Sequence, residues 1–328
     1  MKYNYVIFGT EGLMLNSYSD LFNNEWVEYV SNFRSYIRFK CFHRLHTSRE
    51  INKIFNIPLK RIWNSRYCKA KFNSDKPICF IFFSNWVSFN EEIHLTDYLR
   101  RHYPNCRLVW FLQDMFDKQR KLYSGDKLDY DIVCKQFDLI ISFDKSDCEK
   151  YGFIYHPLVF STYHGEIKEM PQTDIYFLAK AKDRLPEILA TYEVLRESGL
   201  LIDFYLTGVK EEDQKYKDEI HYIQSIPYEE NIQHILHTKC LLEIMQRGST
   251  GYTQRGVEAV CFGKKLLTNN TRINEEPFYR KEYISMFDAP ENIDRCFLSE
   301  IPIIENIDYQ YKHKMSPVEL LEFIETRI

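Results

Sequence analysis

The sequence predicts an α/β protein built from two Rossmann-like β/α/β domains that face a central cleft. The chain has 328 residues, and at about 150 residues per domain this length suggests two domains. Short, continuous apolar runs alternate with helical patterns, as in parallel sheets covered on both faces. The alternation stops at a polar stretch, 161–173, and then restarts. Ligands of such domains bind at the carboxyl ends of the strands, so we expect a cleft there.

The first half of the chain is expected to open with a strand and a helix and to continue with buried strands. Each apolar run in this half is short and is bounded by polar residues, which favours strands. The expected strands are 3–8, 78–84, 107–112, 139–143 and 154–160, and the expected helices are 18–33 and 91–102.

The second half repeats the alternation of strands and helices. We expect a first domain over 1–165, a second domain over 170–312, and a C-terminal helix over 313–328 that can pack back on the first domain. In the second half the expected strands are 174–179, 202–207, 220–223, 240–245 and 265–268, and the expected helices are 183–198, 228–237 and 252–262.

Composition excludes several classes of protein. Hydrophobic residues make up 45% of the chain and charged residues 27%, which is ordinary for a globular protein and excludes disordered, collagen-like and coiled-coil chains. The longest wholly apolar run, 78–83, is far shorter than the roughly 18 to 20 residues that cross a bilayer. The first residues lead directly into a strand-like run rather than a signal peptide. We therefore expect a cytoplasmic protein.

The cysteines do not indicate a metal site or a disulfide framework. The sequence has nine cysteines, an odd number, without a CxxC pair. His234, His237 and Cys240 are spaced at i, i+3 and i+6 within an expected helix and offer three ligands without a fourth. We interpret these three residues as structural and expect no metal.

A glycine-rich segment in the second half predicts an anion site. Gly248, Gly251, Gly256 and Gly263 fall within sixteen residues, between an expected strand and an expected helix. Backbone N–H groups and the positive end of the helix dipole face the same point there, so phosphate is the expected ligand. A tight turn before an ordinary helix would explain Gly248 and Gly251, but not the polar residues around them. These polar residues are Ser249, Thr250, Thr253 and Arg255.

Three segments of this half resemble the bacterial glycosyltransferases of GT-B fold that act in capsule and lipopolysaccharide synthesis. The similar segments are 174–184, 226–231 and 241–270, and the resemblance covers roughly 174–288. It implies that the second domain, 170–312, binds a nucleotide-sugar donor and that the first, 1–165, binds the acceptor. It also implies that the glycine-rich loop holds the diphosphate, that Glu258 binds the ribose hydroxyls, and that Tyr228 lies near the base.

One departure from the family pattern bears on stereochemistry. Many retaining members carry a second Glu eight residues before the ribose-binding one, and here that position is Thr250. Inversion is therefore somewhat favoured, and retention stays open. Residues 252–255 are loosely similar to fucosyltransferase donor loops, so both guanosine and uridine donors stay open.

The diphosphate leaving group needs compensating positive charge. The sequence has one Asp-x-Asp, at Asp129 and Asp131, and no apolar strand precedes it. We therefore expect no metal or other cofactor and assign the charge to basic side chains, although a lysine is more often a surface residue. The expected cations are Lys180, Lys182, Arg184, Arg247 and Arg255.

A basic, aromatic segment lies in the first half. Residues 34–71 contain eleven Lys or Arg and one acid, Glu50. Such a mixture is typical of surfaces that meet anionic lipid or nucleic acid; the alternative is a solvated basic helical pair. No nucleic-acid module accompanies it, and the rest of the chain carries a net charge of −14 (−4 minus +10). We expect a membrane or acceptor surface formed by Arg34, Arg38, Lys40, Arg44, Lys60, Arg61 and Trp63.

The sequence thus predicts a glycosyltransferase, peripheral on the inner face of the plasma membrane, with a lipid-linked or other saccharide acceptor. An inverting transfer needs a base at the carboxyl end of a first-domain strand. Glu11 ranks first, between two glycines, followed by Asp114 and then Asp144, which is better explained as a helix cap. The alternatives are an epimerase of the same fold, a noncatalytic nucleotide-sugar binder, and, remotely, a nucleic-acid-binding protein.

Overall fold

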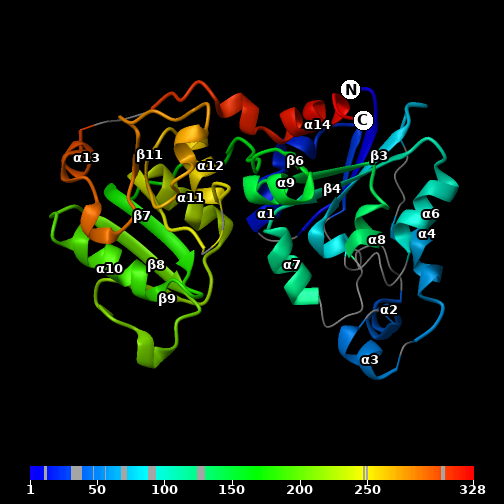
Figure 1. The fold of residues 1–328 in the computed structure, drawn as a ribbon, viewed down its shortest axis with the longest axis horizontal. Helices are drawn as coiled ribbons and strands as arrows, with labels where there is room; N and C mark the ends of the chain where they lie inside the picture. The colour runs from blue at the N-terminus through cyan, green and yellow to red at the C-terminus, as the bar shows by residue number, and fades with distance from the viewer. Residues whose placement is uncertain are drawn as a thin grey trace. The chain divides into compact units, whose positions relative to one another are not determined.

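The chain forms two compact units in the computed structural model (Figure 1). Unit 1 consists of Met1–His156 and Pro317–Ile328, and unit 2 consists of Pro157–Ser316. The residues that the structure describes are 1–10, 13–30, 39–46, 48–55, 57–67, 72–87, 94–123, 130–246, 248, 250–303 and 307–328.

Unit 1 contains a parallel sheet with the strand order β2-β1-β3-β4-β5-β6. The central strands β3 and β4 are apolar and buried along nearly their whole length, which is the pattern of a sheet covered on both faces. The strands are β1 (Asn4–Phe8), β2 (Val27–Val30), β3 (Ile78–Phe83), β4 (Arg107–Leu112), β5 (Leu139–Ser142) and β6 (Ile154–Tyr155).

Two sequence-based expectations in unit 1 were wrong. The expected helix over 18–33 is replaced by a short 3-10 turn, Ser19–Leu21, and by β2, which pairs in parallel with β1. The β-branched and aromatic residues of β2 favour this strand. The expected strand over 154–160 ends at Tyr155, and further along the N–H of Phe160 donates to the carbonyl of Met315.

Short helices surround the sheet of unit 1, and the C-terminal helix belongs to this unit. The phenol of Tyr5, in β1, donates to the carbonyl of Leu321 at 3.2 Å, which places α14 beside the first strand (Figure 1). The helices are α1 (Leu13–Asn16), α2 (Lys40–His46), α3 (Arg49–Ile54), α4 (Asn64–Tyr67), α6 (Leu95–His102), α7 (Phe116–Tyr123), α8 (Tyr130–Cys134), α9 (Lys145–Tyr151) and α14 (Pro317–Glu325), with a 3-10 helix, η2 (Lys60–Trp63).

Unit 2 contains a second parallel sheet, with the order β12-β11-β10-β7-β8-β9. The expected alternation of strands and helices is confirmed here, and β12 is an additional strand. The strands are β7 (Thr173–Lys180), β8 (Ile202–Thr207), β9 (His221–Ile223), β10 (Thr238–Glu243), β11 (Lys265–Thr268) and β12 (Ile284–Met286), and the helices are α10 (Leu185–Arg196), α11 (Tyr228–Leu236), α12 (Gln254–Phe262) and α13 (Arg295–Glu300).

The two parallel sheets and their flanking helices confirm the α/β class. Among the residues that the structure describes, no helix has the length and apolar character needed to cross a bilayer.

Candidate functional site

The strand order of unit 2 defines where a ligand is expected to bind. β7 and β10 are neighbours, but the chain continues from β7 to β8 on one side and from β10 to β11 on the other. Ligands of open α/β sheets bind outside the carboxyl ends of the strands at such a reversal. The candidate donor site therefore lies beyond Lys180, the last residue of β7, and Glu243, the last residue of β10.

The carboxylate of Glu243 anchors the start of α12. Glu243 is buried, and its Oε1 accepts hydrogen bonds from the backbone N–H of Thr253 at 2.8 Å and from its hydroxyl at 2.6 Å. Its Oε2 accepts from the hydroxyl of Thr268, in β11, at 2.6 Å. The sequence analysis missed this residue. The available signal was a lone carboxylate within an apolar strand, since buried carboxylates are rare unless they are hydrogen-bonded.

Replacing Glu243 by Ala is expected to destabilise unit 2. The change removes three hydrogen bonds to a buried carboxylate, and because the two hydroxyls can rotate to other acceptors we expect a loss of about 2 to 3 kcal/mol. Glu243→Gln keeps the shape and one acceptor oxygen, so its loss should be smaller. Urea denaturation of both variants measures the difference, and equal stability of Glu243→Ala and the parent protein would contradict this role.

The loop after β10 is tied to its neighbours on both sides. The N–H of Met245 donates to Oδ1 of Asn269, after β11, at 2.6 Å. Arg184 is buried, and its guanidinium donates to the carbonyls of Ile244 and Lys180, thereby joining the ends of β10 and β7. Arg184 was expected to supply positive charge to the diphosphate of the donor, whereas its buried guanidinium is bonded to backbone carbonyls. Its burial lowers the pKa of the guanidinium.

The glycine-rich loop leads into the N-terminus of α12 as expected. Gly248 has a φ of 80° and is exposed, so this position favours glycine. The hydroxyl of Thr253 caps the helix by accepting the N–H of Arg255 at 3.1 Å. Thr250 is half-buried and Gly251 is buried. The other expected loop residues, Arg247 and Ser249, lie outside the described residues.

Close packing favours glycine at a second point, inside the first turn of α12. A Cβ on Gly256 would lie 3.1 Å from Cβ of Tyr252 and 3.5 Å from Oε1 of Glu243. The helix therefore packs closely on the loop and on its anchoring carboxylate. This close packing keeps the N-terminal N–H groups of α12 near the carboxyl edge of the sheet, where they and the helix dipole favour an anion.

Arg255 and Glu258 are brought together by the structure. They form an ion pair within α12, in which the Glu258 side chain is 0% exposed and that of Arg255 is 14% exposed. Gln254 donates to Glu258 at 3.1 Å. Burial raises the pKa of Glu258, and the neighbouring Arg255 opposes that rise. Arg255 is thus the member of the pair that reaches the surface.

Two residues beyond α12 hold Arg255 in place, and both were missed in the sequence. Asn231, in α11, accepts a hydrogen bond from Arg255 at 3.3 Å and another from the phenol of Tyr176 at 2.9 Å. The guanidinium also lies over the ring of Tyr176, 5.6 Å from its centre. A buried amide and a buried phenol are weak sequence signals, because each is also common in ordinary cores.

The remaining expected donor residues differ in exposure. Lys180 and Lys182 are exposed at the carboxyl end of β7. Tyr228, the first residue of α11, is half-buried, and its ring is stacked on that of Phe160 with centres 6.4 Å apart. The two lysines therefore lie at the surface beyond the carboxyl end of β7.

The expected base residues of unit 1 follow different strands along the sequence. Glu11 lies outside the described residues, but the loop that leads to it is held firmly: Trp86 donates to the carbonyl of Gly9 at 2.8 Å, and the N–H of Thr10 donates to Tyr29 at 3.2 Å. β1 continues to β2 on one side and β3 lies on the other, so this loop is at the reversal of the sheet.

Asp114 and Asp144 follow β4 and β5. Asp114 is exposed and accepts the N–H of Met115 at 3.0 Å. Asp144 is buried and caps α9 by accepting the N–H of Ser146 at 3.0 Å. The structural interpretation of Asp144 is therefore confirmed.

The expected membrane surface is only partly exposed. Arg34 and Arg38 lie outside the described residues, whereas Lys40, Arg44 and Arg61 are exposed. The expectation was wrong for Lys60 and Trp63, which are buried. Trp63 packs against the histidines of α2, which the sequence pattern did not reveal.

The His/Cys pattern of unit 2 has structural partners. His234 lies 2.5 Å from Asp203 and its ring is stacked on Tyr176, and His237 bonds to the carbonyl of Gln233 at 2.8 Å. Within the described part of the chain, no three His, Cys, Asp or Glu residues gather as a metal site would require. Asp129 lies outside that part, and Asp131 belongs to α8.

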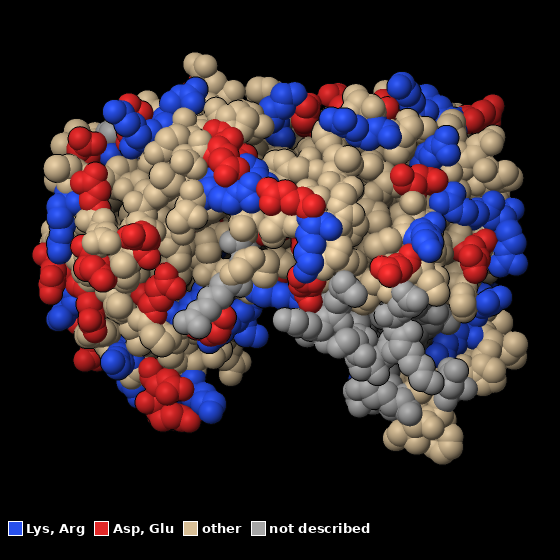
Figure 2. Space-filling model, in the orientation of Figure 1, with Lys and Arg blue, Asp and Glu red and all other residues tan. Residues whose placement is uncertain are grey.

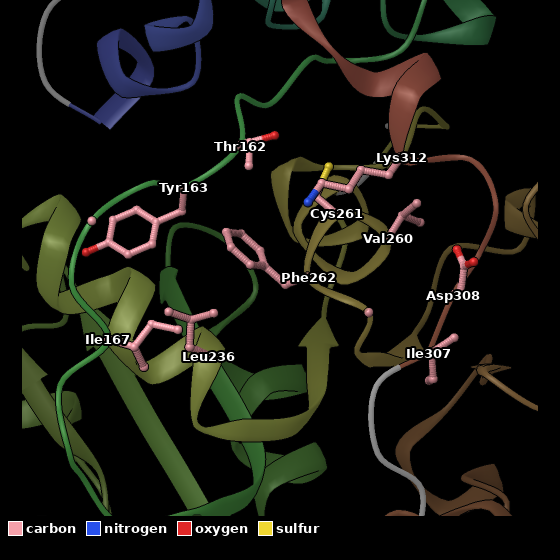
Figure 3. A pocket seen from close by; sticks show the side chains of 12 residues that line it. Thr162, Tyr163, Ile167, Leu236, Val260, Cys261, Phe262, Ile307, Asp308 and Lys312 are labelled. Carbon is pink, nitrogen blue, oxygen red and sulfur yellow. The ribbon is translucent and has the colours of Figure 1, made fainter.

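A cavity of about 380 Å³ lies at the other end of α12 (Figure 3). Its apolar lining includes Ile167, Leu236 and Phe262, and the last turns of α11 and α12 border it. Helix C-termini carry partial negative charge. This cavity is therefore a poor site for a diphosphate and is separate from the loop at the N-terminus of α12.

Comparisons with known proteins identify the fold. No protein-family model matches the chain. No curated protein matches its sequence. Among solved structures, an α-glucosyltransferase in complex with UDP-glucose and DNA containing an abasic site is similar over 98% of this chain and 98% of that chain, with a TM-score of 0.57 and 13% identity. A UDP-forming α,α-trehalose-phosphate synthase from Burkholderia xenovorans is similar over 99% and 98%, with a TM-score of 0.54 and 9% identity. The fold is that of the GT-B glycosyltransferases.

Proposed function

We propose that this protein is a glycosyltransferase that moves a sugar from a nucleotide-sugar donor, bound by unit 2, to an acceptor bound by unit 1. The observation that carries the proposal is the meeting of the glycine-rich loop after β10 with the N-terminus of α12 at the reversal of the second sheet, an arrangement that suits an anion. The solved structures with this fold include one that holds UDP-glucose and one that is UDP-forming, which supports a nucleotide-diphosphate donor.

The residues of this site suit the departure of a nucleoside diphosphate. Charge develops on the leaving phosphate, and preorganised N–H groups and fixed cations stabilise it. The positive end of the α12 dipole and the side chains of Lys180, Lys182 and Arg255 supply that stabilisation in the proposed mechanism, without a metal. Glu258, buried behind Arg255, orients the guanidinium, and Glu258 reaches the ribose hydroxyls only if that ion pair opens.

The finer assignment concerns the acceptor and the stereochemistry. We propose a lipid-linked saccharide acceptor in the synthesis of a capsule or lipopolysaccharide, supported by the family resemblance and by the exposed cations Lys40, Arg44 and Arg61. Thr250 stands where many retaining relatives carry Glu, which favours inversion. The attacking acceptor hydroxyl then loses its proton to a carboxylate of unit 1.

A nucleotide screen by thermal shift tests the donor. We expect UDP or GDP, and their sugars, to raise the melting temperature, because a ligand at 100 times its Kd adds about 2.7 kcal/mol to stability. The matched control is the nucleoside monophosphate, which lacks the second phosphate and should have a much smaller effect. Equal shifts with UDP and UMP, and with GDP and GMP, would contradict a diphosphate site.

Product analysis separates the alternative functions. A transferase consumes the donor sugar only when an acceptor is present, apart from slow hydrolysis. An epimerase converts the donor sugar without an acceptor, and a noncatalytic binder shows a thermal shift without any product. Either of the last two results would overturn the proposed transfer.

A further inference from the structure

The segment 39–67 of unit 1, which we name the α2–η2 lobe, exposes an unusual number of large apolar side chains. The lobe is described over 39–46, 48–55 and 57–67. Of the twelve exposed large hydrophobic residues in the described part of the chain, seven belong to this lobe, with exposed fractions from 52% to 76%. They are Phe39, Phe42, Leu45, Ile54, Phe55, Leu59 and Ile62.

The lobe is ordered by polar contacts in its interior. His43 lies 2.6 Å from the phenol of Tyr67, and Trp63 donates to Nδ1 of His46 at 2.9 Å. The other ring nitrogen of His46 lies 2.6 Å from the carbonyl of Pro58. α2 thus buries its two histidines and leaves Phe42 exposed.

The hydrogen bonds of His46 also connect the segments that carry the exposed apolar residues. His46 connects α2, which carries Phe42 and Leu45, to the segment before η2, which carries Leu59. Through Trp63 it also connects α2 to η2 itself, which carries Ile62. The side chain of Asn52, in α3, donates to the carbonyl of His46 at 3.1 Å, and α3 ends at Ile54. The apolar side chains are therefore presented by a hydrogen-bonded scaffold.

The charged residues of the lobe are almost all basic. Lys40, Arg44, Arg61 and Arg66 are exposed, and the sequence from 39 to 67 contains one acid, Glu50. Figure 2 shows tan and blue atoms among the described residues at the end of unit 1 that carries α2 and α3. Contiguous exposed apolar side chains rimmed by charge mark interaction sites.

We propose that the α2–η2 lobe docks on an anionic lipid bilayer by inserting its apolar side chains between the headgroups, while its cations pair with lipid phosphates. Interfacial elements of this kind combine aromatic and aliphatic side chains with Lys and Arg. This inference rests on the proposed function, because docking of the lobe would bring the enzyme to a lipid-linked acceptor.

Charge favours a bilayer over other occupants of this face. A second copy of the chain would bring the same cations opposite one another, which is repulsive. A nucleic acid would pair with the cations and stack on the phenylalanines, but it would leave aliphatic residues such as Ile54 and Leu59 in water. An anionic bilayer satisfies both the cations and the apolar side chains.

Cosedimentation of the full-length protein with lipid vesicles tests the proposal. The vesicles are phosphatidylcholine with and without phosphatidylglycerol, and the salt concentration is varied. Two sets of variants are compared: Phe42→Ser with Phe55→Ser, and Arg44→Gln with Arg61→Gln. The matched control is Leu201→Ser, which changes an equally exposed apolar residue in unit 2.

We expect the parent protein and Leu201→Ser to bind the anionic vesicles. The Phe variant should bind about tenfold or more weaker at every salt concentration, because apolar transfer is not screened. The Arg variant should lose affinity chiefly at low salt. If the Phe variant binds the vesicles as well as the parent protein does, the proposed insertion is wrong. If none of the proteins binds vesicles, the assigned partner is wrong. The assigned partner is also wrong if the Phe change abolishes self-association or DNA binding instead.

The donor-induced thermal shift is measured on the same variants. Retained shifts with lost vesicle binding would support membrane docking independently of donor binding. Absent shifts in all proteins with vesicle binding retained would overturn the proposed function and leave the docking surface standing.

Discussion

Replacing Glu11 by Gln is expected to lower turnover by about 10² to 10⁴-fold, because a general base contributes a factor of this size. Gln keeps the shape of the side chain and removes its basicity, so donor affinity should change little. The position suits a base: the loop starts at the end of β1, at the reversal of the first sheet, and Trp86 and Tyr29 hold its first residues. Steady-state kinetics with a saccharide acceptor, beside the thermal shift with the donor, measures both quantities.

Two matched substitutions decide between the candidate bases. Asp114→Asn removes the exposed carboxylate after β4, and Asp144→Asn replaces a buried helix cap by a residue that caps equally well. We expect Asp144→Asn to keep full turnover. If Asp114→Asn abolishes turnover and Glu11→Gln does not, the base is Asp114. If neither change matters, the inverting mechanism is wrong.

Replacing Arg255 by Met is expected to destabilise the protein by about 3 to 5 kcal/mol, since it leaves the carboxylate of Glu258 buried without its partner charge. Glu258→Gln should cost less, because Arg255 is partly exposed and water can reach the guanidinium. Replacing both residues by apolar ones should recover most of the loss. Urea denaturation of the three variants measures these differences.

The loss in Arg255→Met should depend on pH. Burial already raises the pKa of Glu258, and Arg255 opposes that rise, so removing Arg255 raises the pKa further. Between the usual pKa of Glu and the raised value the folded state binds more protons than the unfolded state, and stability falls as pH rises through this window. The penalty should therefore be largest at neutral pH and smaller in mild acid. A small loss of stability in Arg255→Met, or a loss that is equal at neutral pH and in mild acid, would contradict the role of Arg255 as the partner of a buried carboxylate.

The α/β class could be predicted from the sequence because parallel strands that are buried on both faces must be continuously apolar. The runs at 107–112, 202–207 and 265–268 became strands with the expected bounds. β2 was missed because its four residues lie within a stretch that also fits a helical pattern. Its β-branched and aromatic residues are compatible with a strand, and its pairing with β1, a contact between residues far apart in the sequence, decides the outcome.

The loop of the candidate site was predicted from local chemistry. A strand, glycines, hydroxyl residues and a helix start in that order place N–H groups at one point, whatever else surrounds them. Glu243, Asn231 and Asn269 were not predicted. Each acts on a residue far along the chain, Asn231 on Tyr176 and Asn269 on Glu187, so no local spacing indicates them.

The sequence by itself determined which residue types this protein offers: a polar glycine-rich turn in unit 2 and a basic, aromatic segment in unit 1. Tertiary structure alone decided which of them face solvent. Trp63 is buried while Phe42 is exposed, because the hydrogen bonds of His43 and His46 orient α2 with its histidines toward Trp63 and Tyr67. Arg184 and Glu258 likewise turn inward, because buried carbonyls and a neighbouring guanidinium satisfy them. Burial depends on contacts between distant segments, and these form only in the folded chain.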